Sequence, residues 1–348
     1  MGKQEIQKVI KAKKGTIVDL EKLQLRYSHR IRTGSIALDY ALGGGVPRGT
    51  LMEYCGPDRS GKTTMAIKLA AEAQKLGKVM FVCSEQEPES SWAEWLGLDI
   101  SKVDVSRFPC AENALDAVAE FVKSKEYSLI IIDSIAGFPT KSSLNANLSK
   151  GIPVGDLVRV VSRFIRNIVY GELGYTSEGE NLTTILVTNQ VRVKMQESFV
   201  GRSEYVLPVG FPLRHAKIGS VMFNSGPFIY DESKERVLGK TVNFEIIKGK
   251  AGMREGYKGT FDLYFGQAPR VENGIDRVME MRIYGVIMGI ITRSGAYFTV
   301  MGKKFHGERE LLDGLYHDEK LYHEVEKAIY TYISSQIGET ENGKSESD

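Results

Sequence analysis

The segment Leu51–Thr64, which reads LMEYCGPDRSGKTT, restricts the possible folds of this chain more than any other segment. Four of its residues fit the pattern G-x-x-x-x-G-K-[ST], in which a Gly-rich loop surrounds phosphate groups: Gly56, Gly61, Lys62 and Thr63. Apolar Leu51–Cys55 predicts a buried strand before the loop, and Thr64–Leu76 predicts a helix after it. A strand, a phosphate loop and a helix in this order predict an α/β protein that binds a nucleoside triphosphate.

The loop would bind phosphates through its backbone and two of its side chains. N–H groups of the loop and of the next helix face the phosphates, where the helix dipole favours anions. Lys62 would reach the outer phosphates, and the Thr63 hydroxyl would bind Mg²⁺. We expect every residue of the loop to contribute to nucleotide binding: Gly56, Pro57, Asp58, Arg59, Ser60, Gly61, Lys62, Thr63 and Thr64. The alternative is a structural glycine turn with an exposed lysine.

Length and composition allow one large domain with a smaller one, or two domains of middling size. The 348 residues are 42% apolar, which suffices for a substantial core, and the net charge of +2 does not identify a partner. Cys55, Cys83 and Cys110 form no CxxC pair, so we expect buried reduced thiols. No signal-peptide pattern or membrane-spanning apolar run occurs, so we expect a cytoplasmic protein without a membrane partner.

Residues 1–32 are basic and precede the main α/β pattern. Ile6, Val9 and Ile10 recur at helical spacing, and Thr16–Leu20 alternates like a short strand. Such a helix and strand have little core of their own to join. The segment is therefore either a basic, partly disordered arm or an arm that docks on a neighbouring subunit. We favour docking because the apolar positions are regular.

Residues 33–268 predict the α/β core. Three apolar runs are typical of parallel strands covered on both faces: Val79–Ser84, Ser128–Asp133 and Thr183–Asn189. Three later runs predict strands that end the sheet with antiparallel partners: Val221–Phe223, Val242–Ile247 and Phe261–Phe265. Strands that alternate with helices favour a doubly wound sheet, whose ligands bind at the carboxyl ends of the strands.

The pattern changes near residue 269, and residues 269–337 predict a compact α/β appendage. Its predicted elements are the helices Asp276–Val286, Glu308–Leu315 and Glu319–Ser335 and the strand Tyr297–Met301. Residues 338–348 are acidic and lack apolar side chains, so they predict a disordered tail.

Three polar residues at predicted strand ends complete a candidate catalytic site. Asp133 is the expected Mg²⁺ residue, with a strand-end cap as the alternative. Glu85 ends the adjacent strand and is the expected general base or water orienter, with a surface role as the alternative. Gln190 follows the next strand, where its amide could sense a γ-phosphate. The carboxyl ends of parallel strands meet at one rim, so we expect these side chains to lie together.

Two long loops, 141–156 and 191–210, leave the same rim. The helix between them, Asp156–Tyr170, would carry a basic face: Arg159, Ser162, Arg163 and Arg166. The second loop interleaves cations with aromatic groups: Arg192, Lys194, Phe199, Arg202 and Tyr205. This combination suits single-stranded nucleic acid, whose phosphates meet cations and whose bases pack on apolar groups. The alternative is a solvated helix face with a flexible lid.

Ordered blocks across residues 13–335 resemble the bacterial RecA-type strand-exchange recombinases. The blocks are Thr33-Gly34-Ser35 with Leu38-Asp39, Gly56–Thr64, Leu129–Ser134, Thr188-Asn189-Gln190 with Arg192, and Ile247-Lys248-Gly249-Lys250. The resemblance implies a RecA-like P-loop NTPase core with a mostly parallel central sheet, an N-terminal helix–strand arm and a small α/β C-terminal domain. It also implies a DNA-dependent ATPase that uses ATP and Mg²⁺. Such a protein forms a helical filament on single-stranded DNA, exchanges strands with homologous duplex DNA, and can work with loader or mediator proteins.

The resemblance assigns roles at the ATP site. Glu85 matches the catalytic glutamate, and Lys62 and Gln190 complete the catalytic set, with Gln190 linking the γ-phosphate to the second DNA loop. Lys248 and Lys250 match a pair that reaches the ATP of the neighbouring subunit. Two further residues fall where the family contacts adenine: Glu89 and Trp92.

The resemblance also assigns DNA contacts and an oligomerisation segment. The matched DNA-binding positions are Arg159, Ser162, Arg166, Arg192, Met195, Phe199 and Gly210. Lys13–Leu20 resembles the segment that adds a strand to the next protomer. Asn147–Gly155 lacks the usual Glu-Ile-Gly-Asp run, and Phe211-Pro212 replaces a characteristic Asn-Ala. These departures concern the DNA contacts and leave the ATP site unchanged.

Two other functions remain compatible with the core fold. One is a ring-forming motor such as a replicative helicase. The other is a regulatory or scaffolding ATPase whose nucleotide controls protein partners without DNA chemistry. The predicted arm and the Lys248/Lys250 pair favour a filament over a ring.

Overall fold

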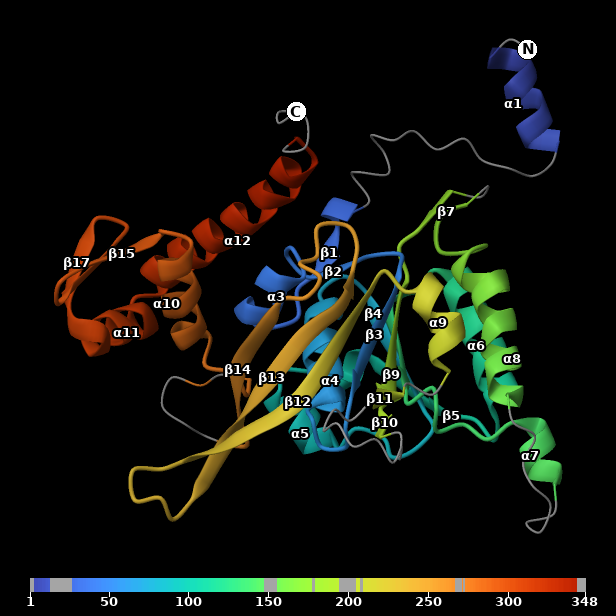
Figure 1. Ribbon diagram of the computed structural model, residues 1–348, viewed down its shortest axis with the longest axis horizontal. Helices are drawn as coiled ribbons and strands as arrows, with labels where there is room; N and C mark the ends of the chain where they lie inside the picture. Colours follow the sequence, from blue (N-terminus) through green and yellow to red (C-terminus); the bar gives the residue numbers. More distant parts are fainter. Residues whose placement is uncertain are drawn as a thin grey trace, which may run out of the picture.

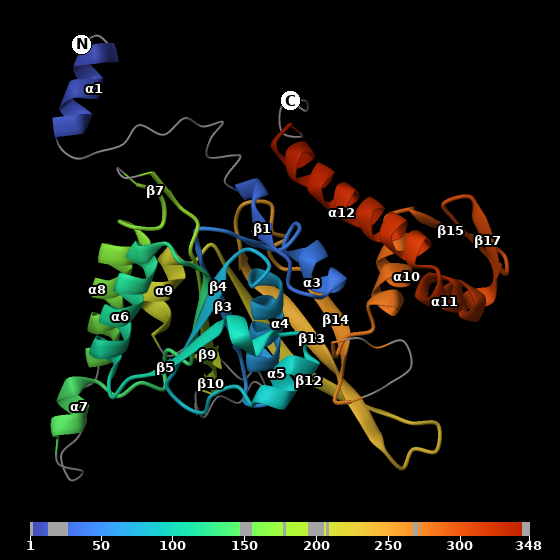
Figure 2. The same cartoon turned by 180° about the vertical axis from the view of Figure 1, so that it is seen from behind.

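The computed structural model of the protein describes most of the chain. The described residues are 3–12, 27–146, 155–176, 179–193, 205–206, 209–266, 271 and 273–342. The segment Lys13–Leu20, most of Asn147–Gly155, and the predicted DNA contacts Met195 and Phe199 lie outside them. Helix α1 (Lys3–Ala12) stands apart from the other described elements in both views (Figures 1 and 2).

An eight-stranded sheet lies at the centre of the described part of the chain, in the order β14-β13-β12-β3-β9-β6-β4-β5 (Figure 1). Its strands are β3 (Leu51–Gly56), β4 (Lys78–Cys83), β5 (Val103–Arg107), β6 (Tyr127–Asp133), β9 (Thr184–Gln190), β12 (Gly219–Tyr230), β13 (Val237–Gly249) and β14 (Lys258–Tyr264). The strands from β12 to β5 pair in parallel, whereas β13 and β14 pair antiparallel. The prediction of a mostly parallel sheet with an antiparallel end is confirmed.

Successive side chains along the central strands pack alternately into two apolar clusters, one on each face of the sheet. On β6, Leu129 and Ile131 join one cluster, whereas Ile130 and Ile132 join the other. Helices α3 (Ile36–Ala41), α4 (Lys62–Ala73) and α5 (Ser90–Trp95) contribute to the first cluster, and α6 (Ala111–Ser124) and α8 (Asp156–Phe164) to the second. The two helix groups lie on opposite sides of the sheet (Figure 2). Burial on both faces explains why the parallel strands read as continuous apolar runs.

Smaller elements complete the core. Among the described residues these are β1 (Arg30–Ile31), β2 (Val46–Pro47), a 3₁₀ turn (Ile100–Lys102), α7 (Lys141–Asn145), β7 (Gly174–Thr176), β8 (Gly179–Asn181), β10 (Arg192–Val193), β11 (Tyr205–Val206) and α9 (Gly210–Ala216). Helix α8 continues into a π-helical turn, Ile165–Val169, inside the predicted helix Asp156–Tyr170. Strands β10 and β11 pair antiparallel and lie within the predicted loop 191–210.

Strand β5 was not predicted, and its composition explains the omission. Its sequence, VDVSR, lacks the apolar run of its neighbours, and its side chains are exposed or half-buried. It lies at one edge of the sheet, where β4 is its neighbouring strand. An edge strand needs fewer apolar residues than a central one, so pattern alone does not reveal it.

The C-terminal part follows β14 and packs beside α3 (Figures 1 and 2). Its elements are α10 (Arg277–Ile287), β15 (Ile291–Ser294), β16 (Tyr297–Val300), β17 (Lys303–His306), α11 (Gly307–His317) and α12 (Glu319–Asn342). The three strands form an antiparallel sheet, of which only β16 was predicted. Helix α12 continues to Asn342, so residues 338–342 are helical where a disordered tail was predicted.

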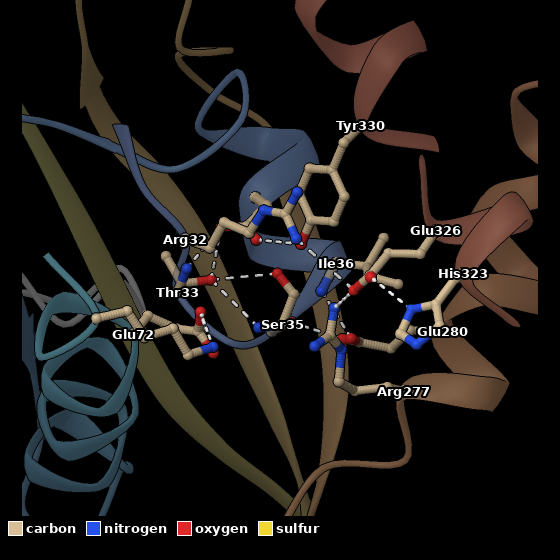
Figure 3. A network of polar contacts seen from close by, with 12 residues as sticks. Arg32, Thr33, Ser35, Ile36, Glu72, Arg277, Glu280, His323, Glu326 and Tyr330 are labelled. Carbon is tan, nitrogen blue, oxygen red and sulfur yellow. Dashed lines mark hydrogen bonds and ion pairs between the residues drawn. The ribbon is translucent and has the colours of Figure 1, made fainter. Parts of the chain in front are cut away.

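Polar contacts join the C-terminal part to the N-terminus of α3 (Figure 3). Glu280 of α10 accepts hydrogen bonds from the Ser35 hydroxyl at 2.5 Å and from the Ile36 N–H at 2.7 Å. Asp39 accepts hydrogen bonds from the Thr33 N–H and hydroxyl, both at 2.8 Å. A third hydrogen bond reaches Asp39 from α12, where the Tyr330 hydroxyl donates at 2.7 Å. A carboxylate at a helix N-terminus satisfies N–H groups that the helix itself leaves unpaired.

Two further expectations concern thiols and membranes. Cys55, Cys83 and Cys110 are all buried and form no disulfide, as predicted. Burial raises the pKa of the Cys55 and Cys83 thiols to about 12, so both stay protonated at neutral pH. None of the helices in the described residues combines the length and the apolar character required to cross a bilayer.

Candidate nucleotide site

The phosphate loop connects β3 to α4, and two glycines allow its path. A Cβ on Gly56 would lie 2.2 Å from the carbonyl oxygen of Phe223, so no larger residue fits against β12. Gly61 has a φ of 101° and immediately precedes α4, in a left-handed conformation that other residues rarely adopt. The motif glycines therefore bring the loop close to the sheet and turn its backbone into the helix.

A polar cavity of about 260 Å³ lies against this loop, at the carboxyl ends of the strands. The lining includes the loop from Asp58 to Thr64 together with Glu85, Asp133 and Gln190. The structure thus brings together the loop and all three polar residues predicted at strand ends. Glu85 follows β4, Asp133 ends β6 and Gln190 ends β9, which are adjacent in the sheet order.

Lys62 is the buried cation of the loop, with 7% of its surface exposed. Its ammonium donates a hydrogen bond to the carbonyl of Pro57 at 2.6 Å. Burial lowers the pKa of Lys62, while the nearby carboxylates of Asp58 and Asp133 act in the opposite direction. A bound polyphosphate would favour the charged form further, because it adds negative charge next to the ammonium.

Thr63 and Asp133 form the candidate Mg²⁺ site. The Thr63 hydroxyl donates to one carboxylate oxygen of Asp133 at 2.8 Å, and the Thr188 hydroxyl donates to the other. The described residues hold no cluster of three or more His, Cys, Asp or Glu that could enclose a metal. A hydroxyl and one carboxylate still fit Mg²⁺, which takes few protein oxygens and completes its shell with phosphate and water.

The Glu85 carboxylate is held at the rim of the same cavity. It accepts a hydrogen bond from the Ser134 hydroxyl at 3.1 Å. Ser84 supports this contact, because its hydroxyl donates to the Ser134 carbonyl at 2.8 Å. Arg107 of β5 donates to the Glu85 carbonyl at 2.5 Å. One oxygen of the carboxylate is thus oriented by Ser134, which suits a group that positions water or accepts a proton.

Sequence reasoning missed four residues of the cavity lining: Ser134, Lys240, Leu263 and Phe265. Ser134 directly follows Asp133 and was findable as a strand-end polar residue. The other three come from β13, β14 and the residue after β14. Strand β13 pairs antiparallel with β12, and β14 pairs antiparallel with β13. Their position beside the phosphate loop depends on this strand order, which sequence periodicity does not predict.

The predicted adenine contacts lie outside the cavity lining. The Glu89 side chain caps α5 by accepting hydrogen bonds from the N–H groups of Ser91 at 3.0 Å and Trp92 at 2.7 Å. The Ser91 hydroxyl and these N–H groups lower the pKa of Glu89. Trp92 is half-buried and packs against the larger apolar cluster. Both residues are therefore placed by helix capping and packing, and their adenine role stays a prediction.

Lys248 and Lys250 lie at the C-terminal end of β13, outside the lining of the phosphate cavity. Lys248 pairs with Ser220 of β12, and Ser220 in turn pairs with Glu53, three residues before Gly56 along β3. Lys250 comes just after the end of β13. Neither lysine lines the cavity of its own chain. The ammonium of Lys248 donates to the Arg214 carbonyl.

The predicted DNA-binding residues of α8 and its π-helical turn lie largely at the surface. Arg159 and Arg166 are exposed, and Arg159 forms an ion pair with Asp156 at 3.3 Å. The Ser162 hydroxyl donates to the Val158 carbonyl at 2.7 Å. The other predicted positions are Arg192 on β10, Gly210 at the start of α9, and Met195 and Phe199 outside the described residues.

Residues 3–267 match the family described as the RecA N-terminal domain. Curated relatives named Protein RecA match most of the chain. The one from Sulfurimonas denitrificans is 32% identical over 321 residues, which covers 91% of this chain and 88% of the relative. Those from Campylobacter fetus and Thermotoga neapolitana are 32% and 31% identical and cover 93% and 91% of this chain, with 88% of each relative matched.

Proposed function

Since the chain belongs to the RecA family, we propose that it is an ATP-dependent DNA recombinase. Protomers would polymerise on single-stranded DNA, pair it with a homologous duplex and exchange strands in recombination and repair. Family membership implies nucleotide binding and makes ATPase activity and DNA binding the expected properties. At about 32% identity to the relatives, strand exchange itself is our proposal.

One observation carries the proposal: the phosphate loop, Glu85, Asp133 and Gln190 line a single cavity. Gln190 ends β9, and β10 begins two residues later at Arg192. The second predicted DNA loop therefore starts directly beside the nucleotide site. A change in the contacts of Gln190 can alter the start of this loop without passing through other elements.

We assign the hydrolytic step to residues of this cavity. Lys62 and the backbone N–H groups of the loop bind the outer phosphates. Thr63 and Asp133 would hold Mg²⁺, which would neutralise phosphate charge. Glu85 orients water for attack on the γ-phosphorus and accepts its proton as ADP leaves. Gln190 contacts the γ-phosphate, so its environment changes when that phosphate is released. Hydrolysis then acts as a switch that ends DNA binding.

The position of Lys248 and Lys250 supports a site shared between subunits. Lys248 lies two strands from β3, at the level of Glu53, which is three residues or roughly 10 Å before Gly56 along the strand. Neither lysine lines the cavity of its own chain, so their cations are placed for another ligand. Burial lowers the pKa of Lys248 to about 8, and the nearby Lys250 and Lys217 add repulsion. A neighbour's polyphosphate would relieve this repulsion, which favours a homo-oligomer with ATP between protomers.

The N-terminal arm fits the same assembly. Val9 on α1 is 52% exposed, and the helix stands apart from the other described elements (Figure 1). An amphipathic helix that stands apart from the other described elements is suited to docking on another protomer. The cytoplasmic location and any loader or mediator protein belong to the proposal as family expectations.

Two rival functions are separated by electron microscopy and by ATP hydrolysis. Filaments on single-stranded DNA with ATPγS would support the recombinase, whereas closed hexamers alone would support a ring-forming motor. We expect single-stranded DNA to stimulate ATP hydrolysis. Absence of stimulation would favour a regulatory or scaffolding ATPase without DNA chemistry.

Lys62→Ala should abolish nucleotide binding or turnover, and near-normal turnover in that variant would refute the assigned site.

A further inference from the structure

Lys240 brings a second lysine to the phosphate cavity, from a strand far from the motif in sequence. It lies on β13, where it pairs with Phe228 of β12 and Leu263 of β14. Eight residues separate it from Lys248, so the two lysines lie at opposite ends of β13, roughly 25 Å apart. Lys248 does not line the cavity, whereas Lys240 does, beside the phosphate loop.

The Lys240 ammonium is buried beside the loop without a carboxylate. Only 8% of the residue surface is exposed, and the ammonium donates a hydrogen bond to the carbonyl of Arg59. Lys240 forms no ion pair with any of the described residues. Desolvation by burial lowers the pKa of its ammonium. Lys217, another buried lysine, pairs with the carboxylate of Glu53. Burial of a cation is costly unless an anion compensates it, so Lys240 lacks the compensation that Lys217 has.

Lys62 and Lys240 approach the loop in the same way. Each ammonium donates one hydrogen bond to a loop carbonyl, Lys62 to Pro57 and Lys240 to Arg59. An ammonium has three donors, so each lysine has further donors for a ligand. Both lysines line the cavity, where two cations on different elements suit a ligand with several negative charges.

Ser60 supplies an independent sign of an anion in the cavity. Its residue surface is 1% exposed, it lines the cavity, and its hydroxyl has no hydrogen-bond partner in the part of the chain that the structure describes. A buried hydroxyl without a partner costs free energy. An oxygen acceptor of a ligand would satisfy this donor.

We infer that Lys240 is a second phosphate-binding cation of the nucleotide site, acting from β13 opposite Lys62. The inference rests on the proposed function, which provides ATP as the polyphosphate. The motif specifies one cation, Lys62, together with backbone N–H groups, and Lys240 adds a charge that the motif does not encode. Its contribution is to nucleotide affinity, because its ammonium contacts the phosphate loop at the Arg59 carbonyl.

The test compares Lys240→Met with Lys258→Met by titration of a fluorescent, non-hydrolysable ATP analogue with Mg²⁺. Methionine keeps the length of the apolar stem and removes the charge. Lys258 is the matched control, because it lies on the adjacent strand β14 with its side chain 74% exposed and paired with Glu245. We expect Lys240→Met to bind the analogue about tenfold more weakly or worse, since a hydrogen bond to a charged group is lost. Lys258→Met should match the unsubstituted protein.

A thermal melt separates ligand binding from a structural role. Without nucleotide, Lys240→Met should unfold at the same temperature as the unsubstituted protein or higher, because an uncompensated buried charge is removed. The analogue should raise this temperature less in Lys240→Met. A loss of nucleotide-free stability with unchanged analogue affinity would overturn the inference and assign Lys240 to holding Arg59.

A second titration with a single-stranded oligonucleotide identifies the source of the phosphate. A defect in oligonucleotide binding with normal binding of the analogue would overturn the inference, because Lys240 would then serve DNA. Equal analogue affinity in both variants and the unsubstituted protein would also overturn it. If the unsubstituted protein fails to bind the analogue at all, the proposed function itself fails, which is a different result from equal affinity.

Discussion

Two regions of this protein bury charged groups, and they treat them differently. At the joint between the core and the C-terminal part, Asp39 accepts several hydrogen bonds from the chain itself. Glu280 does the same (Figure 3). At the phosphate cavity, Lys62 and Lys240 donate to backbone carbonyls of the loop. The Ser60 hydroxyl there has no partner among the described residues.

This difference in hydrogen-bond partners distinguishes groups that hold the fold together from groups that are placed to bind a ligand. Buried ionisable groups that the chain hydrogen-bonds by itself favour one arrangement of its parts, and removing one partner leaves the other unpaired. Buried charges that meet only weak partners of their own chain favour a ligand of opposite charge. Substitutions at the joint should therefore reduce stability, whereas substitutions in the cavity should change ligand binding or turnover with little loss of stability.

The largest effect is expected from Glu85→Gln in the cavity. The amide keeps the shape of the side chain but cannot accept a proton, so ATP hydrolysis should slow by roughly 10²–10⁴-fold. Binding of ATP and DNA should persist, giving long-lived filaments. Glu87→Gln is the control, because Glu87 pairs with Arg107 and does not line the cavity. Rapid turnover of Glu85→Gln would place the base elsewhere.

Arg277→Met should weaken the joint from its C-terminal side, where the guanidinium acts on the buried carboxyl groups of Asp39 and Glu280. Arg277 pairs with Glu326 of α12 at 2.5 Å, and the two side chains are 23% and 17% exposed. Removal of the guanidinium should destabilise the protein by about 3 kcal/mol and lower its unfolding temperature, measured by circular dichroism. Nucleotide affinity should stay unchanged. Arg309→Met, at a side chain 95% exposed, should have little effect on either; equal melts of the two variants would refute the contrast.

The joint also predicts a pH dependence of stability. Burial raises the pKa of Glu280 from its ordinary 4.5 to about 7, and burial raises that of Asp39 too. Between pH 4.5 and 7 the folded state then binds more protons at Glu280 than the unfolded state, so the contribution of this group to stability is fully present below pH 4.5 and is lost as the pH rises toward 7. The Glu280 contribution is at most about 1.4 kcal/mol for each pH unit. Glu280→Gln should flatten this slope, whereas Glu324→Gln, on the exposed side of α12, should not; identical slopes would contradict the assignment.

The smallest effect concerns DNA. Arg166 is exposed on the turn that continues α8, and its guanidinium is a predicted phosphate contact. Arg166→Ala should weaken binding of single-stranded DNA and reduce the slope of log affinity against log salt by about one phosphate contact. Lys123→Ala on α6 should leave the slope unchanged. An unaltered slope in Arg166→Ala would exclude this residue as a contact.

The sequence predicted the phosphate loop and the strand ends because both are local features. The Gly–Lys–Thr spacing specifies the loop, and Glu85, Asp133 and Gln190 follow apolar runs whose carboxyl ends meet at one rim. Lys240 was missed because its position depends on β13 running antiparallel beside β12, a long-range pairing. No local pattern distinguishes this lysine from one exposed on a strand.

The polar contacts at the joint could not be predicted from the sequence either. The block Thr33-Gly34-Ser35 with Leu38-Asp39 was used only as part of the family resemblance. Its partners, Glu280 and Tyr330, lie more than 240 residues later in the chain. Helix periodicity predicted α10 and α12 but not the burial of a carboxylate at the N-terminus of α3. Contacts between distant polar residues require the assembled fold.

The most direct test of the proposed function is strand exchange. The purified protein would be incubated with ATP, Mg²⁺, circular single-stranded DNA and either a homologous or a heterologous linear duplex, with Lys62→Ala as the control. We predict joint molecules and exchanged strands only with the homologous duplex, only with ATP and not with Lys62→Ala. Nucleotide-dependent DNA binding without any homology-dependent product would contradict the proposal that this protein is a recombinase.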